Sequence, residues 1–145
     1  MKQIAVIPCG KKKIWDIEPR TGPVYAKEAY QGTLHKKCTQ YARFHHLYPV
    51  ILSAKYGFLK PDDIVPADYD VGFQHHFGVI SDEALISQWH AKGFSRTETI
   101  VVLTGKKHIR VLNRVIDTPH QWEFPLAHAR GIGDMLRILD QSVQR

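Results

Sequence analysis

Three apolar runs of the sequence end in the same way, and they constrain the fold more than any other feature. The runs cover residues 3–8, 50–53 and 99–103. Each run reaches a small thiol or hydroxyl residue, and glycine and lysine follow just beyond it. Continuous apolar runs, rather than alternating ones, are typical of strands that are buried on both faces of a parallel sheet.

Stretches with helical signals separate these runs. We expect helices over residues 34–46, 106–115 and 131–143, and a fourth that Ser81 caps and Gly93 ends. Alternation of strands and helices predicts a single α/β domain over residues 1–145. Its mostly parallel open sheet would carry helices on both faces, in three layers.

Two stretches are expected to be irregular. Residues 14–24 contain two prolines and a glycine, so a loop is predicted there rather than a helix. Residues 56–80 are rich in turn-forming residues, and a loop of that length is more often functional than idle. Residues 122–125 are expected to form a short edge strand, because proline is tolerated only at a sheet edge.

The loops that follow the three strands are predicted to form one anion site. In an open parallel sheet, ligands bind beyond the carboxyl ends of the strands, and here backbone N–H groups and lysine ammonium groups would line that place. The loop after the third strand opens directly onto a helix, whose N-terminal amides can hold a phosphate. The residues predicted to bind substrate or phosphate are Gly10, Lys11, Lys12, Lys13, Tyr30, Gly32, Ser53, Lys55, Gly57, Thr104, Gly105, Lys106 and Gly131.

Four residues are candidates for chemistry, each with a plainer alternative. Cys9 lies near cations and free amides, which favour a thiolate, although it is also a small residue suited to a strand end. Tyr56 can stack on a base or simply pack at a rim. Asp68 and Asp70 lie two apart and point the same way in an extended segment. They can act as a base, a nucleophile or a ribose-hydroxyl acceptor, or remain solvated turn carboxylates.

Composition argues against metal, cofactor and membrane classes. The nine histidines include two adjacent pairs, which do not converge on one face, and the zinc spacings are missing, so neither a metal nor a cofactor is expected. Cys9 and Cys38 make no disulfide framework, which favours a reducing cytoplasm, and Cys38 lies on a predicted core stripe. No apolar run is long enough to span a membrane, and the start does not match a signal peptide.

Charge is distributed unevenly along the chain. Residues 1–60 hold 11 lysines and arginines against three carboxylates, a net charge of +8, whereas residues 61–145 carry a net charge of −2. Such asymmetry is typical of a chain whose basic half binds a polyanion. A solvated basic face without a partner is an equally good interpretation of the charge alone.

The motifs themselves resemble a known family. Residues 8–13 (Pro-Cys-Gly-Lys-Lys-Lys), 30–32, 52–59 (Leu-Ser-Ala-Lys-Tyr-Gly-Phe-Leu), 69–70 and 131–133 are similar to those of the bacterial and phage DUF6884 family across nearly the whole chain. The cysteine and serine loops are more distantly similar to a domain of archaeosine synthase, which works on a deazaguanine base in tRNA, and to the DNA-binding protein YaaA. Residues 14–19 depart from the archaeosine-synthase pattern, so its chemistry does not transfer. The resemblance implies a nucleobase or nucleic-acid context.

Together these features predict a nucleotide- or nucleobase-binding enzyme. The expected chemistry is base modification in nucleic acid or reaction at an N-glycosidic bond, with a phosphate-containing partner. Two other classes stay open: a non-catalytic DNA- or RNA-binding protein that uses the basic N-terminal half, and a subunit that lends its lysine loop to a larger enzyme.

Overall fold

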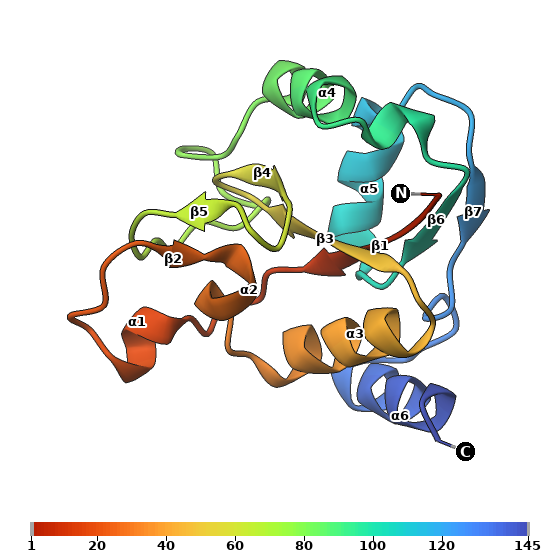
Figure 1. Ribbon diagram of the computed structural model, residues 1–145, viewed down its shortest axis with the longest axis horizontal. Helices are drawn as coiled ribbons and strands as arrows, with labels where there is room; N and C mark the ends of the chain where they lie inside the picture. Colours follow the sequence, from red (N-terminus) through yellow and green to blue (C-terminus); the bar gives the residue numbers. More distant parts are fainter. Residues whose placement is uncertain (1, 145) are drawn as a thin grey trace.

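Strand β1 lies at the centre of a five-stranded sheet with the order β4-β3-β1-β6-β7 (Figure 1). The computed structural model describes residues 2–144. The strands of this sheet are β1 (Gln3–Pro8), β3 (Tyr48–Ser53), β4 (Gly57–Leu59), β6 (Thr99–Val102) and β7 (Gln121–Glu123). Every neighbouring pair is parallel except β3 and β4, which form an antiparallel hairpin.

Helices cover both faces of this sheet, which confirms the predicted α/β fold. The helices are α1 (Ile14–Ile17), α2 (Ala26–Ala29), α3 (Thr33–Phe44), α4 (Asp82–Ala91), α5 (Lys106–Val115) and α6 (Ile132–Ser142), with a short 3-10 helix, η1 (Phe94–Arg96). Ile4 and Val6 point into the core beneath α4 and α5, whereas Ala5 and Ile7 point into the core beneath α3 and α6. The strand runs are therefore continuously apolar because both of their faces are buried.

The order of the strands places a crevice beside β1. From β1 the chain crosses to β3 on one side, and later it returns to β6 on the other side. In open α/β sheets, ligands bind at such a switch point, outside the carboxyl ends of the strands. The loops after β1, β3 and β6 therefore leave the same edge of the sheet, as the sequence predicts.

The prediction of a loop over residues 14–24 was wrong. Helix α1 forms one turn there, because the Asp16 carboxylate accepts a hydrogen bond of 2.8 Å from the Lys13 backbone N–H at the helix start. Strand β2 (Val24–Tyr25) then pairs with β5 (Ile64–Val65), inside the stretch predicted to be irregular. This small second sheet lies beside the main one, together with α1 and α2 (Figure 1).

Of the other predicted helices, α4 agrees with the prediction at both ends, whereas α3 begins one residue earlier than the predicted residue 34. Ser81 Oγ accepts the Ala84 N–H at 3.1 Å and Gly93 follows α4 with φ of +85°, so both predicted ends of α4 are confirmed. Helix α3 instead begins at Thr33, with Gly32 in the N-cap position. None of the helices within residues 2–144 has the length and apolar character needed to cross a membrane.

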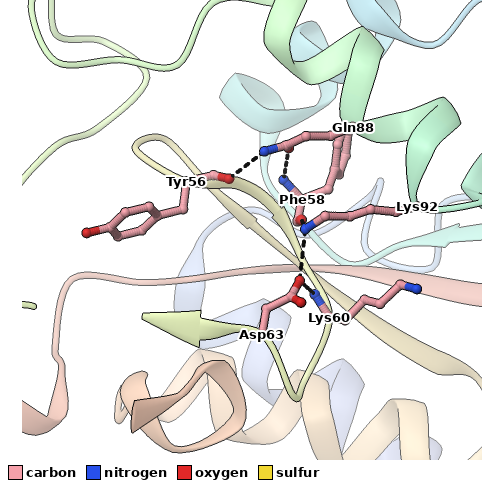
Figure 2. A network of polar contacts seen from close by, with 6 residues as sticks. All are labelled: Tyr56, Phe58, Lys60, Asp63, Gln88 and Lys92. Atoms are coloured by element: carbon pink, nitrogen blue, oxygen red, sulfur yellow. Dashed lines mark hydrogen bonds and ion pairs between the residues drawn. The ribbon is translucent and has the colours of Figure 1, made fainter. Parts of the chain in front are cut away.

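A polar network ties the β3–β4 hairpin to helix α4 (Figure 2). The Gln88 amide donates to the Tyr56 carbonyl at 2.9 Å and accepts the Phe58 N–H at 2.8 Å. Strand β4 is the outermost strand of the sheet, so Gln88 satisfies backbone groups that would otherwise lack a partner. Gly57 has φ of +79°, and a Cβ there would lie 2.1 Å from Gln88 Oε1, so a glycine is required for this approach.

Lys92 and Asp63 extend the network to the next turn. Lys92 Nζ donates to the Phe58 carbonyl and to Asp63 Oδ2, the latter at 2.8 Å. Asp63 also accepts the Lys60 backbone N–H at 2.8 Å. Burial raises the pKa of Asp63, but the Lys92 hydrogen bond, the Lys60 N–H and the charges of both lysines outweigh it, so the pKa lies below its ordinary value of 3.8.

Replacing Gln88 with alanine is expected to destabilise the protein by about 1–3 kcal/mol, because it leaves the Phe58 N–H and the Tyr56 carbonyl without partners. Urea denaturation of the variant and the wild type measures the difference. Gln40→Ala on the exposed face of α3 is the matched control, since Gln40 is solvent-exposed. Equal losses in the two variants would show that the hairpin does not depend on Gln88.

The Asp63 ion pair should make stability depend on pH. A carboxyl group with a lowered pKa in the folded state stabilises the fold above about pH 4, and this contribution is lost as pH falls through the folded pKa. Asp63→Asn should therefore unfold more readily than the wild type at pH 7, and the difference should shrink below pH 4. Asp62→Asn, at the neighbouring and more exposed carboxylate, should differ less from the wild type at pH 7. A constant difference between pH 3 and pH 7 would exclude the ion pair as the cause.

Candidate functional site

A cavity of about 680 Å³ opens beyond the carboxyl ends of β1, β3 and β6. Each of the three loops contributes to its wall, through Cys9 and Gly10, through Ala54, and through Gly105. The segment from Asp70 to His75 and the first residues of α5 and α6 complete the wall. The predicted site residues that line this cavity are Cys9, Gly10, Lys11, Lys13, Asp70, Gly105 and Lys106.

Lys13 is the most unusual residue of the cavity wall, because its side chain is only 3% exposed. Its Nζ donates to the Lys11 carbonyl at 3.0 Å and lies 4.4 Å from the centre of the Tyr69 ring. Among the described residues, no carboxylate forms an ion pair with it. An ammonium has three N–H donors, and a buried charge without a counter-charge is costly. Lys13 therefore suits an anionic group that enters the cavity.

Local backbone structure fixes which of the three lysines points inward. Lys13 forms a β-bridge with Tyr30, and its N–H is held by Asp16 at the start of α1. Lys11 lies exposed on the cavity wall. Lys12 is exposed outside that wall, and its carbonyl accepts the Gln31 N–H at 2.9 Å.

Three hydroxyl groups lie behind the cavity wall. Ser53 Oγ accepts the backbone N–H groups of Lys55 and Tyr56 at 3.2 and 3.1 Å, so its own proton is left to donate to Tyr69 Oη, 2.7 Å away. Tyr30 Oη lies 2.5 Å from Tyr69 Oη and is buried. If Tyr30 also donates, Tyr69 accepts twice and directs its own proton at the Cys9 thiol. That arrangement gives every hydroxyl proton an acceptor.

Opposing effects act on the Cys9 thiol. Burial raises its pKa, whereas the Lys13 charge, the Tyr69 hydroxyl and the backbone N–H groups of Ala54 and Cys9 itself lower it, and the balance leaves the pKa raised. Burial also raises the pKa values of Tyr30 and Tyr69, so both hydroxyls stay neutral donors. Cys9 is thus a thiol at neutral pH, beside groups that would stabilise its thiolate.

His108 lines the cavity and His35 holds its Pro8 wall from behind, and sequence reasoning missed both. His35 is buried on α3, and its Nδ1 donates to the Pro8 carbonyl at 2.8 Å, which holds the end of β1. Burial lowers the pKa of His108, on the first turn of α5, to about 4, and its ring meets that of Phe73 at 5.3 Å. The signal for His108 was its place just after a strand end. No sequence signal marked His35.

The structure separates the two predicted aspartates. Asp70 is exposed on the cavity wall, close to the loop residues Val71 and Phe73. Asp68 is exposed outside the wall, and its carboxylate accepts the Tyr69 N–H at 2.9 Å, which is a turn contact. Tyr69, which sequence reasoning gave only as the residue between them and as part of the 69–70 motif, is the residue that points inward.

The Lys55–Gly57 segment lies behind the hydroxyl groups and does not line the cavity. The Tyr56 ring packs edge-on against Tyr69 at 5.2 Å, and Lys55 Nζ lies 5.8 Å from the centre of the same ring. Gly57 faces α4, and the Tyr56 side chain points away from that network (Figure 2).

Three further predicted residues also lie outside the cavity wall. Gly32 and Gly131 occupy the N-cap positions of α3 and α6. Thr104 is buried, and its hydroxyl has no hydrogen-bond partner among the described residues. Within residues 2–144, no three metal-ligating side chains gather at one place.

Removing the Lys13 charge should raise the pKa of Cys9 further and slow its alkylation, because iodoacetamide reacts with the thiolate. Lys13→Met and Tyr69→Phe should both lower the rate at pH 8 and shift its midpoint to higher pH. Mass spectrometry can follow Cys9 separately from Cys38, whose pKa burial raises to about 12. Lys12→Met is the matched control. An unchanged rate in Lys13→Met, or an equal change in Lys12→Met, would contradict this account.

Comparison with known proteins agrees with the motifs. The chain is 47% identical over 145 residues to "Uncharacterized protein YfjM" of Bacillus subtilis (strain 168), and the match covers 99% of this chain and 97% of that protein. The family model described as "Family of unknown function (DUF6884)" matches residues 4–141. The chain therefore belongs to the DUF6884 family.

Proposed function

We propose that this protein is an enzyme that binds a nucleotide in the 680 Å³ cavity and acts on its base or its N-glycosidic bond. The observation that carries the proposal is the buried Lys13 ammonium, which lines the cavity beside Cys9 and has no carboxylate partner among residues 2–144. A cation held in this way, next to a potential nucleophile, suits a substrate that carries an anion close to its reacting atoms.

The phosphate group has several suitable contacts on one side of the cavity. Lys11 and Lys106 are exposed on the wall, and Lys13 lies deeper. Helix α5 begins directly at this wall with Gly105 as its N-cap, so its first N–H groups add to the positive potential.

A base ring fits the apolar part of the wall. Leu34, Val71, Phe73 and Met135 face the cavity, and a volume of about 680 Å³ lies within the range of small-molecule sites. Asp70 lies on the same wall and can accept hydrogen bonds from ring N–H or ribose hydroxyl groups. A nucleotide uses both halves of such a cavity, since it joins an apolar ring to a phosphate.

Two groups on the wall can do the covalent or acid–base work. Cys9 can act as the nucleophile, positioned by Tyr69 and favoured as a thiolate by Lys13. Asp70 can accept a proton. Tyr56 and Asp68, which were predicted to take part, lie outside the wall and cannot reach a ligand in the cavity from there.

The test is a thermal-shift screen against nucleobases (deazaguanines included), nucleosides and their mono-, di- and triphosphates. A ligand that binds only the folded state stabilises it by about 2.7 kcal/mol at 100 times its Kd. We expect one compound to raise the Tm of the wild type and of Lys12→Met at 200 mM salt, and to have little effect on Lys13→Met. Cys9→Ser or Asp70→Asn should then keep the shift but lose product formation.

Two outcomes would overturn the proposal. A shift that persists in Lys13→Met would contradict the role of the buried Lys13 ammonium as the partner of the bound anion. A shift seen only with polynucleotides, and lost on adding salt, would instead favour a non-catalytic nucleic-acid-binding protein.

A further inference from the structure

A second, smaller hollow of about 260 Å³ lies directly beside the large cavity. The two share three lining residues, which are Phe73, Gln74 and Lys107. Phe73 is half-buried, and its ring meets the His108 ring at 5.3 Å. The hollows are therefore neighbours with a common wall, and a ligand in one can continue into the other.

The smaller hollow differs from the cavity in its chemistry. Its remaining walls are Arg110, Val111 and Arg114, so three of its six lining residues are cations and none is a carboxylate. Lys107, Arg110 and Arg114 are spaced i, i+3 and i+7 on helix α5, which places them on one face over about 10 Å.

Not all of these cations are free to meet a ligand. Arg114 is paired with Asp82, whose oxygen lies 3.0 Å from Arg114 Nε. Lys107 and Arg110 are exposed, and neither forms an ion pair with a carboxylate of residues 2–144. The two unpaired cations lie at the boundary of the hollows and in the smaller one.

We propose that the smaller hollow holds the phosphate of a neighbouring nucleotide, so that the substrate is a nucleotide within a single-stranded nucleic acid. The inference rests on the proposed function of the large cavity, which receives the unstacked nucleotide itself. Lys107 contacts the connecting phosphate, Arg110 contacts the next one, and the Phe73 ring stacks on a base. A stacked base in a duplex cannot enter a walled cavity, and a single strand avoids the unpairing cost.

The experiment compares short single-stranded homo-oligomers of each base, as DNA and as RNA, with the matching 5′-mononucleotides. Isothermal titration at 50 and 200 mM salt gives the affinities. We expect one oligomer to bind at least about tenfold more tightly than its mononucleotide, because a phosphate–arginine contact is added. Arg110→Ala should remove most of that gain and leave mononucleotide affinity unchanged. The slope of log affinity against log salt concentration should fall by roughly the value of one phosphate contact. Arg43→Ala, an exposed arginine on α3, is the matched control.

The outcomes separate this inference from the proposed function. Mononucleotide binding that is lost in Lys13→Met, with oligomers no tighter, keeps the cavity and overturns the second phosphate site. If oligomer affinity falls in Arg110→Ala but is unchanged in Lys13→Met, the proposal that the large cavity binds a nucleotide is overturned instead. An equal effect of Arg110→Ala and Arg43→Ala would show a general charge effect and overturn the second site. Comparison of the DNA and RNA oligomers shows whether the site prefers deoxyribose or ribose.

Discussion

The burial of the Lys13 ammonium is the constraint on which the site depends. A charge removed from water is costly unless it is paired, and here the protein offers it only the Lys11 carbonyl and the face of the Tyr69 ring. The buried position is maintained by the backbone of Lys13, which is held by Tyr30 on one side and by Asp16 on the other. A buried cation without a counter-charge costs stability, and under the proposed function an anionic ligand would supply the missing partner.

The small second sheet is what delivers the groups around Lys13. Strands β2 and β5 pair residues about 40 positions apart, and this pairing brings the segment of Tyr30 close to the segment of Tyr69. The Tyr30 and Tyr69 hydroxyls then meet Ser53 at the end of β3. The main sheet sets the position of the cavity, whereas the second sheet sets its chemistry. The hairpin network of Gln88 and Lys92 supports both, because it fixes the turn from which Ser53 accepts its two N–H groups.

The sequence was sufficient for the main sheet because its signals are local. Continuous apolar runs that end in small residues predict buried parallel strands, and the common edge of such strands predicts the meeting of Cys9 and Gly105. The sequence was not sufficient to predict which of the three lysines points into the cavity. That depends on a one-turn helix whose start is held by Asp16. Sequence reasoning also missed the roles of Tyr69 and His35, since a hydroxyl group or an imidazole acquires its role from partners on other elements. Gly57 shows the same limit, because a glycine after a strand suits a binding site as well as a turn, and only the fold brings it against Gln88.

The electrostatics of the cavity connect ligand position to the role of Cys9. Burial raises the pKa of Cys9 and lowers that of His108, so the cavity disfavours charge on either group. A phosphate and the Cys9 thiolate would both be stabilised by the single positive charge of Lys13. A phosphate bound at Lys13 would leave Cys9 a neutral thiol that can donate a hydrogen bond or a proton. A phosphate held instead by Lys11 and Lys106 at the rim would leave Lys13 to stabilise the thiolate as a nucleophile. The position of the anion relative to Lys13 therefore decides whether Cys9 acts as a donor or as a nucleophile.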